Sequence, residues 1–533
     1  MRAIGAPLPP LPAALVAGGH RDLLAPLRFL APGVLESGVL ASGALGLDAP
    51  VTVDRSTLAH ALAAGNGACG HPAAEQLASK LADPATRVVV TGQQPGLFGG
   101  PLLTLAKAAA AVRWAETLEA AGMPAVAVFW VATQDHDFAE TATASLLAEN
   151  GLERVHLGDD PTPLMPVGMR PFGAPLRPVL ERAQALYAGE HAAERWQRIA
   201  SWYRPDARFG EAFSRFLIAL FGARSPLMLD AMDSTVKRLE KPFLEQLVVH
   251  RVALAAAQQD ANQRLEARDL PLQVAPQPGA SPLFLLRGQQ RRRILWHGAD
   301  AWFLRGAHSE PESIAALLEI VRDNPAVISP GVLARPAIQD ALLGTTLQVL
   351  GPSEMAYMAQ ATGAYRVLGI DAPWTTLRPQ TLVLEPRQRA QLDELGIDLG
   401  ALGERSVERL IADRLGGDVV APVRAQIAAS LAELAAPIAA LDPTLEGPRT
   451  KTARQVDRAL EQLGGKVAAA IARRHAVWHR RLSAIQSACF PGGKGQERTL
   501  SVAHFFVRHG AALAEAYLEQ MALDPRVVQV VYI

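Results

Sequence analysis

Two apolar runs enclose a glycine-rich loop and a helical segment between residues 87 and 140, and this order constrains the fold more than any other feature. Arg87–Thr91 and Pro124–Ala132 are rich in β-branched and aromatic residues, which is typical of buried strands. Leu102–Ala121 has the composition of a helix that follows Pro101 and stops at Gly122. The order strand, loop, helix, strand predicts a parallel α/β sheet whose strands end at one ligand-binding edge.

The loop after the first run reads Gly-Gln-Gln-Pro-Gly-Leu-Phe-Gly-Gly over Gly92–Gly100. It is not a Walker loop, because no Gly-Lys-Ser/Thr follows, and it does not fit the dinucleotide pattern G-x-G-x-x-G. Glycines let backbone N–H groups approach a ligand closely, and the N-terminus of a helix favours an anion. These properties predict ligand-binding roles for Gly92, Gln93, Gln94 and Gly96. A tight turn with no ligand is the alternative.

Polar side chains also follow the second run, in Thr133-Gln134-Asp135-His136-Asp137. Asp137 stands three residues before Glu140, which is the spacing of a helix-capping pair. A histidine titrates near neutral pH, so His136 and its neighbour Asp135 are the predicted catalytic acid/base groups. Consecutive side chains on an extended segment point to opposite faces, which disfavours a metal site, and we predict no tightly bound metal.

Residues 345–360 repeat the pattern of strand, turn and helix. Thr345–Leu350 reads as a strand, and Gly351-Pro352-Ser353 turns from it into a helix. Three polar residues recur roughly along one face of that helix: Glu354, Tyr357 and Gln360. Three more precede the strand: Arg335, Gln339 and Asp340. We predict that both groups form a wall of the pocket, with helix caps and a solvated face as the alternative.

Leu283–Arg305 alternates between apolar and polar residues and predicts a hairpin that turns at Gly298-Ala299-Asp300. It carries a group of arginines: Arg287, Arg291, Arg292 and Arg293. A phosphate or RNA patch is one interpretation. We favour a solvated hairpin face, because no other basic cluster joins it.

From Glu385 to Ala488 apolar residues fall at helical spacing along two segments that meet at Leu441-Asp442-Pro443-Thr444. Two long helices with a turn between them predict an antiparallel coiled-coil hairpin, which Pro437 should kink. The same spacing would also serve an internal bundle. The final residues, Arg526–Ile533, read as a strand that could join the sheet of the first domain and bring Arg498 back towards the pocket.

Length and composition exclude several classes of protein. At 533 residues the chain should contain more than one folding unit. Its 52 basic and 52 acidic residues balance, which argues against nucleic acid or an anionic membrane as a partner. No run of about 18 apolar residues is present, and the proline-rich first residues lack a continuous apolar stretch, so we expect neither a membrane span nor a signal peptide. Only Cys69 and Cys489 occur, so we expect a cytoplasmic protein without a disulfide framework.

Several motifs together resemble one family, the bacillithiol biosynthesis cysteine-adding enzymes, or BshC cysteine ligases. The resemblance runs nearly end to end and rests on Val90–Pro101, Phe129–Ala132, Asp135–Phe138, Asn324–Ala326, Ser329-Pro330, Arg335-Pro336, Gln339-Asp340, Gly351–Tyr357, Pro491–Gly493 and Gln496–Arg498. Two positions depart from the family pattern. Gln134 stands where the family usually has glutamate, which removes a carboxylate, and Gly344 stands where it usually has proline.

The resemblance implies a Rossmann-like core with an inserted subdomain over residues 1–384, a coiled-coil hairpin over 385–488 that forms a homodimer, and a tail over 489–533 that returns to the core. It implies a ligase that joins cysteine to glucosaminyl malate through an amide bond, the last step of bacillithiol synthesis. Lys107 and Lys494 lie within family segments, where contact with an anionic ligand and simple solvation are equal alternatives. Arg498, also in a family segment, is a predicted ligand-binding residue. Amide formation from a free carboxylate needs activation, so we expect ATP with Mg²⁺. Backbone N–H groups of Gly92–Gly100 would hold the developing negative charge.

Two alternatives belong to other classes. An adenylate-forming nucleotidyltransferase of the class I synthetase type also has a motif loop after its first strand, but the usual His-x-Gly-His signature is absent. A non-catalytic dimeric scaffold built around the coiled coil would need no ligand site.

Overall fold

The computed structural model describes residues 5, 7–34, 53–148, 151–298, 300–306, 310–416 and 419–533. The chain divides into two compact units. The larger comprises Gly5–Leu382 and Glu497–Ile533, and the smaller is built on Val383–Gln496. Within the described residues, none of the helices combines the length and the apolar character that crossing a membrane requires.

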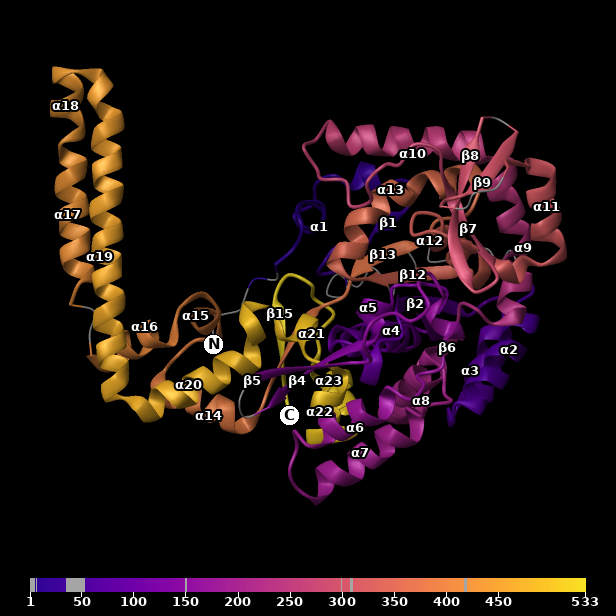
Figure 1. Cartoon of the computed structure of the whole chain (residues 1–533), viewed down its shortest axis with the longest axis horizontal. Helices are drawn as coiled ribbons and strands as arrows, with labels where there is room; N and C mark the ends of the chain where they lie inside the picture. The colour runs from indigo at the N-terminus through magenta and orange to yellow at the C-terminus, as the bar shows by residue number, and fades with distance from the viewer. Residues whose placement is uncertain are drawn as a thin grey trace. The chain divides into compact units, whose positions relative to one another are not determined.

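A six-stranded parallel sheet forms the centre of the larger unit (Figure 1). Its order is β1 (Arg28–Phe29), β13 (Trp374–Leu377), β12 (Thr345–Leu350), β2 (Arg87–Gln93), β3 (Ala125–Val131) and β6 (Leu227–Asp230). All of the strand pairs in it are parallel, as the sequence predicts. From β2 the chain adds β3 and β6 on one side and later β12 and β13 on the other, which is the strand order of a doubly wound nucleotide-binding sheet.

Helices cover both faces of this sheet because its strands carry apolar side chains in both directions. Val88, Val90 and Val128 pack in one cluster with residues of α2 (Arg55–Ala68), α3 (Ala74–Ala82), α9 (Ser234–Val249) and α12 (Arg335–Leu343). The glycine-rich loop leads into α4 (Leu103–Ala120), which packs on β2 and β3, and Phe129 contacts Phe213 of α8 (Phe209–Phe221). The predicted strand–loop–helix–strand unit is therefore confirmed.

A second, antiparallel sheet is inserted between β6 and β12. Its order is β10 (Glu312–Ser313), β9 (Ala301–Leu304), β8 (Gln290–His297), β7 (Ala280–Arg287) and β11 (Ile328–Pro330), accompanied by α10 (Arg251–Glu266) and α11 (Ile314–Asp323). The predicted hairpin is confirmed for β8 and β9, which pair antiparallel with His297 opposite Ala301. The prediction missed a further turn between Arg287 and Gln290, where Gly288 adopts a φ of 63°. Of the predicted turn at 298–300, Ala299 lies outside the described residues.

The smaller unit contains the predicted helical hairpin. α17 (Ala421–Glu433) and α18 (Ala435–Leu441) run beside α19 (Glu446–Arg474), and a turn at Pro443–Leu445 joins them (Figure 1). The break between α17 and α18 lies one turn before Pro437, which has no N–H to bond the carbonyl of Glu433. The second arm is not continuous as predicted, since it breaks at His475 before α20 (Ala476–Cys489).

The end of the chain does not join the central sheet, contrary to expectation. β15 (Val528–Tyr532) pairs with β14 (Gln380–Leu384) in a separate two-stranded sheet. The residues before it still return to the larger unit. Pro101 and Ser501 form a bridge, and the N–H of Leu102 donates to the carbonyl of Leu500 at 2.7 Å. The first turn of α4 is thereby covered by the C-terminal segment.

Candidate functional site

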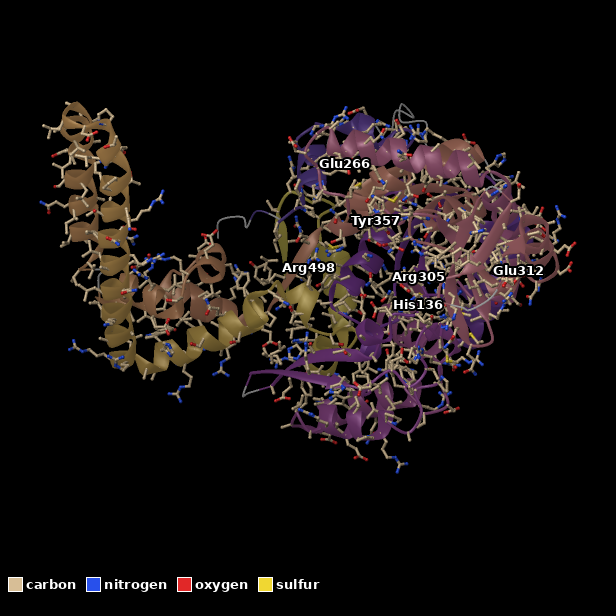
Figure 2. All side chains as sticks on the ribbon, turned by 45° about the horizontal axis from the view of Figure 1, so that its top comes forward. His136, Glu266, Arg305, Glu312, Tyr357 and Arg498 are labelled. Carbon is tan, nitrogen blue, oxygen red and sulfur yellow. The ribbon has the colours of Figure 1, made fainter. Side chains whose placement is uncertain are left out.

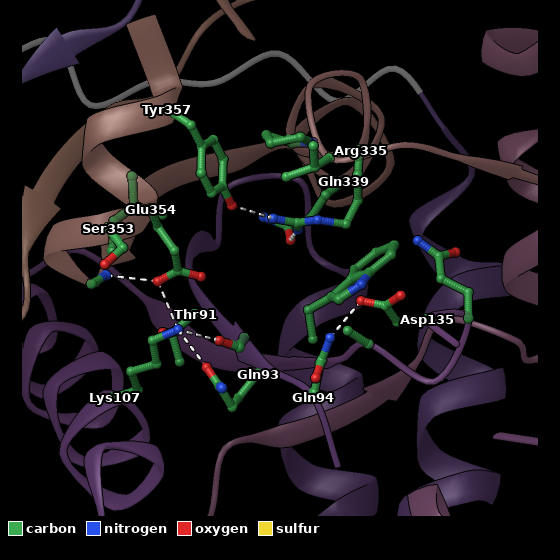
Figure 3. Close-up of a pocket in the computed structure, with 18 of the residues that line it drawn as sticks. Thr91, Gln93, Gln94, Lys107, Asp135, Arg335, Gln339, Ser353, Glu354 and Tyr357 are labelled. Carbon is green, nitrogen blue, oxygen red and sulfur yellow. Dashed lines mark hydrogen bonds and ion pairs between the residues drawn. The ribbon is translucent and has the colours of Figure 1, made fainter. Parts of the chain in front are cut away.

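A cavity of about 620 Å³ opens at the carboxyl ends of β2 and β12 (Figure 3). The strand order reverses between these two strands, which is where open α/β sheets bind ligands. The walls come from the ends of β2 and β3, the β7–β8 hairpin, α12, the first turn of α13 (Pro352–Leu368) and α21 (Gln496–Thr499). Segments far apart in the sequence therefore build one site.

The strands at the floor of the cavity can lie close together because residue 92 is a glycine and has no side chain. In the parallel register Gly92 lies beside Trp130, and Val90 lies two residues earlier beside Gln348. A Cβ atom at Gly92 would come within 2.7 Å of the Trp130 carbonyl oxygen, so only glycine fits without moving a strand. Gln348 and Trp130 both line the cavity on either side of this gap.

Lys107 cross-links β2 to α13 at the edge of the cavity (Figure 3). Its Nζ donates to the Gly92 carbonyl at 2.7 Å and to Gln93 Oε1 at 2.9 Å, and it pairs with Glu354 Oε2 at 2.6 Å. An ammonium group has three donors, and the protein uses all of them. Burial lowers the pKa of Lys107, and Glu354 opposes that shift. The prediction that Lys107 itself contacts an anionic ligand is therefore replaced by a positioning role.

The predicted acid/base pair lies at the end of β3 and lines the cavity. Asp135 accepts from Gln94 Nε2 at 2.5 Å and from the backbone N–H of His136 at 2.7 Å. Arg291 Nη1 lies 3.2 Å from His136 Nδ1. A guanidinium can only donate, so Nδ1 accepts and the neutral ring carries its proton on Nε2. Burial first, and Arg291 second, lower the pKa of His136 below 6.5, which keeps the ring neutral at pH 7.

Arg291 corrects the interpretation of the arginine-rich hairpin. Alternation along β8 directs Arg291 and Arg293 to the cavity, whereas Arg287 is half exposed and pairs with Glu312. The side chain of Arg291 is only 7% exposed; it donates to Ser329 Oγ at 2.8 Å and lies 3.8 Å from the centre of the Phe284 ring. Burial lowers the pKa of Arg291 to about 10, so it stays charged. The solvated-face interpretation is wrong for these two arginines.

Arg335 and Tyr357 form the opposite wall (Figure 3). Arg335 Nη1 donates to Gln339 Oε1 at 2.6 Å, and Nη2 donates to the Tyr357 hydroxyl at 3.3 Å. Burial would lower the pKa of Arg335, but Tyr357 and Glu354 raise it above its ordinary value. The predicted wall residues Arg335, Gln339, Glu354 and Tyr357 are thus brought together.

The C-terminal segment supplies the last wall. Glu497 accepts two hydrogen bonds from Arg378, at 2.7 and 2.8 Å, and both side chains are almost fully buried. The next residue, Arg498, lines the cavity with an exposed side chain, as predicted, and Figure 2 labels it together with Tyr357 and His136. Its guanidinium has no hydrogen-bond or ion-pair partner within the described residues, so it is available to a ligand.

Charge and unpaired polar atoms indicate what the cavity can bind. Six cationic side chains line it (Lys107, Arg291, Arg293, Arg335, Arg378 and Arg498) against three carboxylates (Asp135, Glu140 and Glu354). Five of its buried polar atoms have no partner among the described residues: Gln94 Oε1, Trp130 Nε1, Gln134 Oε1, Gln348 Oε1 and Arg378 Nε. Each such atom costs roughly 1–3 kcal/mol unless a ligand or water satisfies it. The cavity therefore fits a polar ligand with net negative charge.

The second half of the glycine-rich loop, Gly96–Gly100, does not face the cavity as predicted for a ligand-binding loop. Gly96 lies outside the cavity lining, and a Cβ there would come within 2.7 Å of Gly100 Cα. The N–H groups of Gly96, Gly99 and Gly100 donate to Gln94 O, the Tyr203 hydroxyl and Leu97 O. Phe98 anchors this half against Trp196 and Tyr203. These three N–H groups are used within the protein, so in this conformation none of the three is directed to an oxyanion.

Three other predicted residues lie away from the cavity lining. Gln360 is buried and makes four hydrogen bonds, to Gln273, Val274 and Asn262. Gln360 follows Glu354 by six residues, whereas two full turns of an α-helix take about seven, so the two side chains do not point in the same direction. Asp340 is buried behind the floor and accepts from three side chains. Lys494 belongs to the smaller unit, and its predicted role stays a prediction.

Several cavity residues were missed by the sequence analysis: Glu140, Arg291, Arg293, Gln348 and Arg378. Two signals could have found some of them. Gln348 is a polar residue within an apolar strand, and Arg378 is a charged residue that directly follows the end of β13. Alternation along β8 predicts that Arg291 and Arg293 share a face, but which face meets the sheet depends on the tertiary structure.

Fold and cavity define a Rossmann-like α/β protein with a cationic ligand site at the switch point of its sheet. Residues 47–379 match the N-terminal Rossmann-like domain of the bacillithiol biosynthesis protein BshC, and residues 381–532 match its C-terminal coiled-coil domain. The chain belongs to the BshC family, which confirms the resemblance.

Individual relatives agree along most of the chain. The protein named "Putative cysteine ligase BshC" from Solibacter usitatus is 32% identical over 457 residues, which is 84% of each chain. A protein of the same name from Thermus thermophilus is 33% identical over 435 residues, covering 80% of this chain and 84% of the relative. The similarity thus includes both the Rossmann-like core and much of the coiled-coil unit.

Proposed function

We propose that this chain is a cysteine ligase that joins the carboxyl group of cysteine to the amine of glucosaminyl malate in the last step of bacillithiol synthesis. The observation that carries this proposal is the net cationic cavity at the switch point of a BshC-family fold. Glucosaminyl malate brings two carboxylates, and guanidinium groups pair with carboxylates through directed hydrogen bonds. Arg335 and the unpaired Arg498 are the groups best placed to bind them.

We propose ATP as the second substrate, because a free carboxylate does not form an amide without activation. ATP would supply that activation by making the departing oxygen of cysteine a good leaving group. The residues present fit a polyphosphate: the cavity has an excess of cations, and Arg378 Nε is a buried donor without a partner among the described residues. The carboxylate oxygens of Glu140, which also lines the cavity, fit the preference of the accompanying Mg²⁺ for oxygen ligands.

The hydrogen bonds around His136 assign different roles to the acid/base pair. With its only lone pair directed at Arg291, the neutral ring has an N–H to offer at Nε2. We therefore assign to His136 the donation of a hydrogen bond to the oxygen that becomes negative when the amine attacks. Asp135 keeps carboxylate lone pairs beyond the two hydrogen bonds that it accepts from Gln94 and His136, so it would accept the proton that the amine loses.

A mass-spectrometric assay tests this function directly. Purified chain is incubated with ATP, Mg²⁺, cysteine and glucosaminyl malate, and each component is omitted in turn. We expect the amide product only in the complete mixture. Arg498→Met should raise the KM for glucosaminyl malate, whereas Arg287→Met, an exposed arginine outside the cavity, should leave it unchanged. A folded wild-type chain that makes no amide would overturn the proposal.

The products formed from ATP in the same assay distinguish the ligase from the nucleotidyltransferase and scaffold alternatives. Cysteine-dependent exchange of pyrophosphate into ATP would identify nucleotidyl transfer, whereas release of inorganic phosphate would identify an acyl phosphate route. A chain that forms stable oligomers but binds none of the three substrates would be the scaffold. Gln93→Ala and Gln94→Ala should weaken ligand binding. Each also removes a hydrogen bond to a charged neighbour, Lys107 or Asp135, so the free energy of unfolding should fall by roughly 1–3 kcal/mol.

A further inference from the structure

Charged neighbours dictate the orientation of three glutamine amides in the cavity. Gln94 Nε2 donates to Asp135 at 2.5 Å, and Gln348 Nε2 donates to Asp340 Oδ2 at 2.6 Å. Gln93 Oε1 instead accepts from Lys107 Nζ at 2.9 Å. A carboxylate can only accept and an ammonium can only donate, so each amide has one favoured orientation. The carbonyl oxygens of Gln94 and Gln348 are buried without a partner among the described residues, and both glutamines line the cavity.

Asp340 controls one of these amides from outside the cavity. Its side chain is buried on α12, behind the strand that carries Gln348. Besides the bond from Gln348, its carboxylate accepts from the Tyr365 hydroxyl at 2.5 Å and from Gln339 Nε2 at 3.3 Å. Burial raises the pKa of Asp340 to about 6, so the carboxyl group is mostly ionised at pH 7 and then only accepts hydrogen bonds.

The free carbonyl oxygens make the floor chemically different from the rim. Gln348 Oε1, Gln94 Oε1 and Gln134 Oε1 are all buried without a partner among the described residues. A carbonyl oxygen repels carboxylates and phosphates and attracts hydroxyl or amine N–H groups. The arginines of the rim have the opposite preference. The cavity thus offers donor-binding positions on the floor and anion-binding positions around them.

We propose that Asp340 is a positioning residue that holds the carbonyl oxygen of Gln348 in the cavity floor, and that this oxygen, with that of Gln94, selects the hydroxyl and amine groups of the acceptor's sugar ring. The identity of the acceptor rests on the proposed function. In Asp340→Asn the partner of Gln348 offers both a donor and an acceptor. The amide of Gln348 can then turn over and present an N–H group to the sugar instead.

Calorimetry on the full chain tests this inference with two probes, glucosaminyl malate and malate alone. We expect Asp340→Asn and Gln348→Met to weaken glucosaminyl malate binding roughly tenfold while leaving malate binding unchanged. Glu240→Gln is the matched control, because Glu240 is an equally buried carboxylate that pairs with Lys237 on α9. It should change neither affinity. Melting temperatures show whether each variant is folded, and Gln348→Met tests the floor directly if Asp340→Asn does not fold.

The other outcomes contradict the inference. Equal losses for both probes would make Asp340 a general structural residue. Unchanged affinity for glucosaminyl malate in both variants, or no binding of it to the wild type, would mean that the floor does not bind the sugar. The product assay is read separately. If the two variants show the selective loss of affinity but the wild-type chain forms no amide, the sugar subsite stands and the ligase function is overturned.

Discussion

His136 and Arg291 meet at one hydrogen bond, and that contact sets the protonation of the site. A proton on His136 Nδ1 would place two cations 3.2 Å apart in a partly buried cavity. Burial and the charge of Arg291 both lower the pKa of His136. The ring is therefore neutral at pH 7, and its protonated form appears only in acid.

The first prediction concerns the pH dependence of catalysis. Since neutral His136 is the active form, kcat/KM should fall as the pH drops through a His136 pKa that lies below 6.5. Arg291→Gln removes one cause of the lowered pKa, so this acid limb should move to higher pH. Arg287→Gln, an exposed change on the same hairpin, should not move it. A limb that stays in place in Arg291→Gln would have to belong to another group.

The second prediction separates His136 from Asp137. Asp137 Oδ1 accepts from the Glu140 N–H at 3.1 Å, which confirms the predicted helix cap. Asp137→Ala should lower the free energy of unfolding by about 0.5–2 kcal/mol, and Asp137→Asn, which can still cap, should be nearly neutral. His136→Asn should abolish turnover with little change in melting temperature. If activity and stability respond in the reverse pattern, the two roles are exchanged.

At the scale of elements, a buried ion pair helps to bind the C-terminal segment to the core. Arg378, directly after β13, makes two hydrogen bonds to Glu497 at the start of α21, and Glu497 also accepts from the Thr381 N–H at 2.8 Å. The segment holds Arg498 at the cavity and covers the start of α4 through Leu500 and Ser501. Binding and stability are therefore linked at this point.

The third prediction follows from that link. Glu497→Ala leaves the Arg378 charge buried without its partner, so the free energy of unfolding should fall by about 3–5 kcal/mol. The KM for the anionic substrates should also rise, because Arg378 and Arg498 both line the cavity. Urea denaturation and steady-state kinetics measure the two effects. Glu153→Ala breaks an exposed pair with Arg182 and should cost only about 0–1 kcal/mol, and an equally small effect of Glu497→Ala would contradict this account.

At the scale of the whole molecule, the coiled-coil arm leaves apolar side chains uncovered. Val423, Leu434 and Leu463 are 48%, 46% and 50% exposed, and α17 has no buried residue. Apolar side chains at coiled-coil spacing are favoured when another helix covers them. We therefore expect the chain to form a homodimer through this arm.

The fourth prediction tests that assembly. Replacing Val423, Leu434 and Leu463 together by glutamate should convert the dimer to a monomer in sedimentation, because charges would replace the apolar contacts. Val252→Glu is the control, since Val252 is more exposed, at 69%, and lies on α10 in the larger unit. Deleting Glu385–Ala488 and bridging the ends should likewise leave a monomeric core. A core that still dimerises would place the interface elsewhere.

The sequence by itself determined the elements whose signals are local. Apolar runs, glycine and proline stops and helical spacing predicted β2, α4, β3, the turn into α13 and the helical hairpin. The sequence also predicted that Gln93, Gln94, Asp135 and His136 lie at the ligand-binding edge, because polar residues that follow a buried parallel strand lie at that edge of the sheet. The second strand–turn–helix pattern added Arg335 and Tyr357 to the same site, and a family motif added Arg498.

Only the tertiary structure decided which atoms of these residues remain free. Lys107, Asp340 and Gln360 have the right chemistry for ligands, but their donors and acceptors are satisfied by partners distant in sequence. Arg291 and Arg293 were assigned to solvent because a strand's alternation does not say which face packs on another sheet. The C-terminal strand paired with β14 outside the central sheet, because a strand's own residues do not specify which edge it joins. Hydrogen-bond partners and packed faces arise from contacts between separate segments, and no local pattern encodes them.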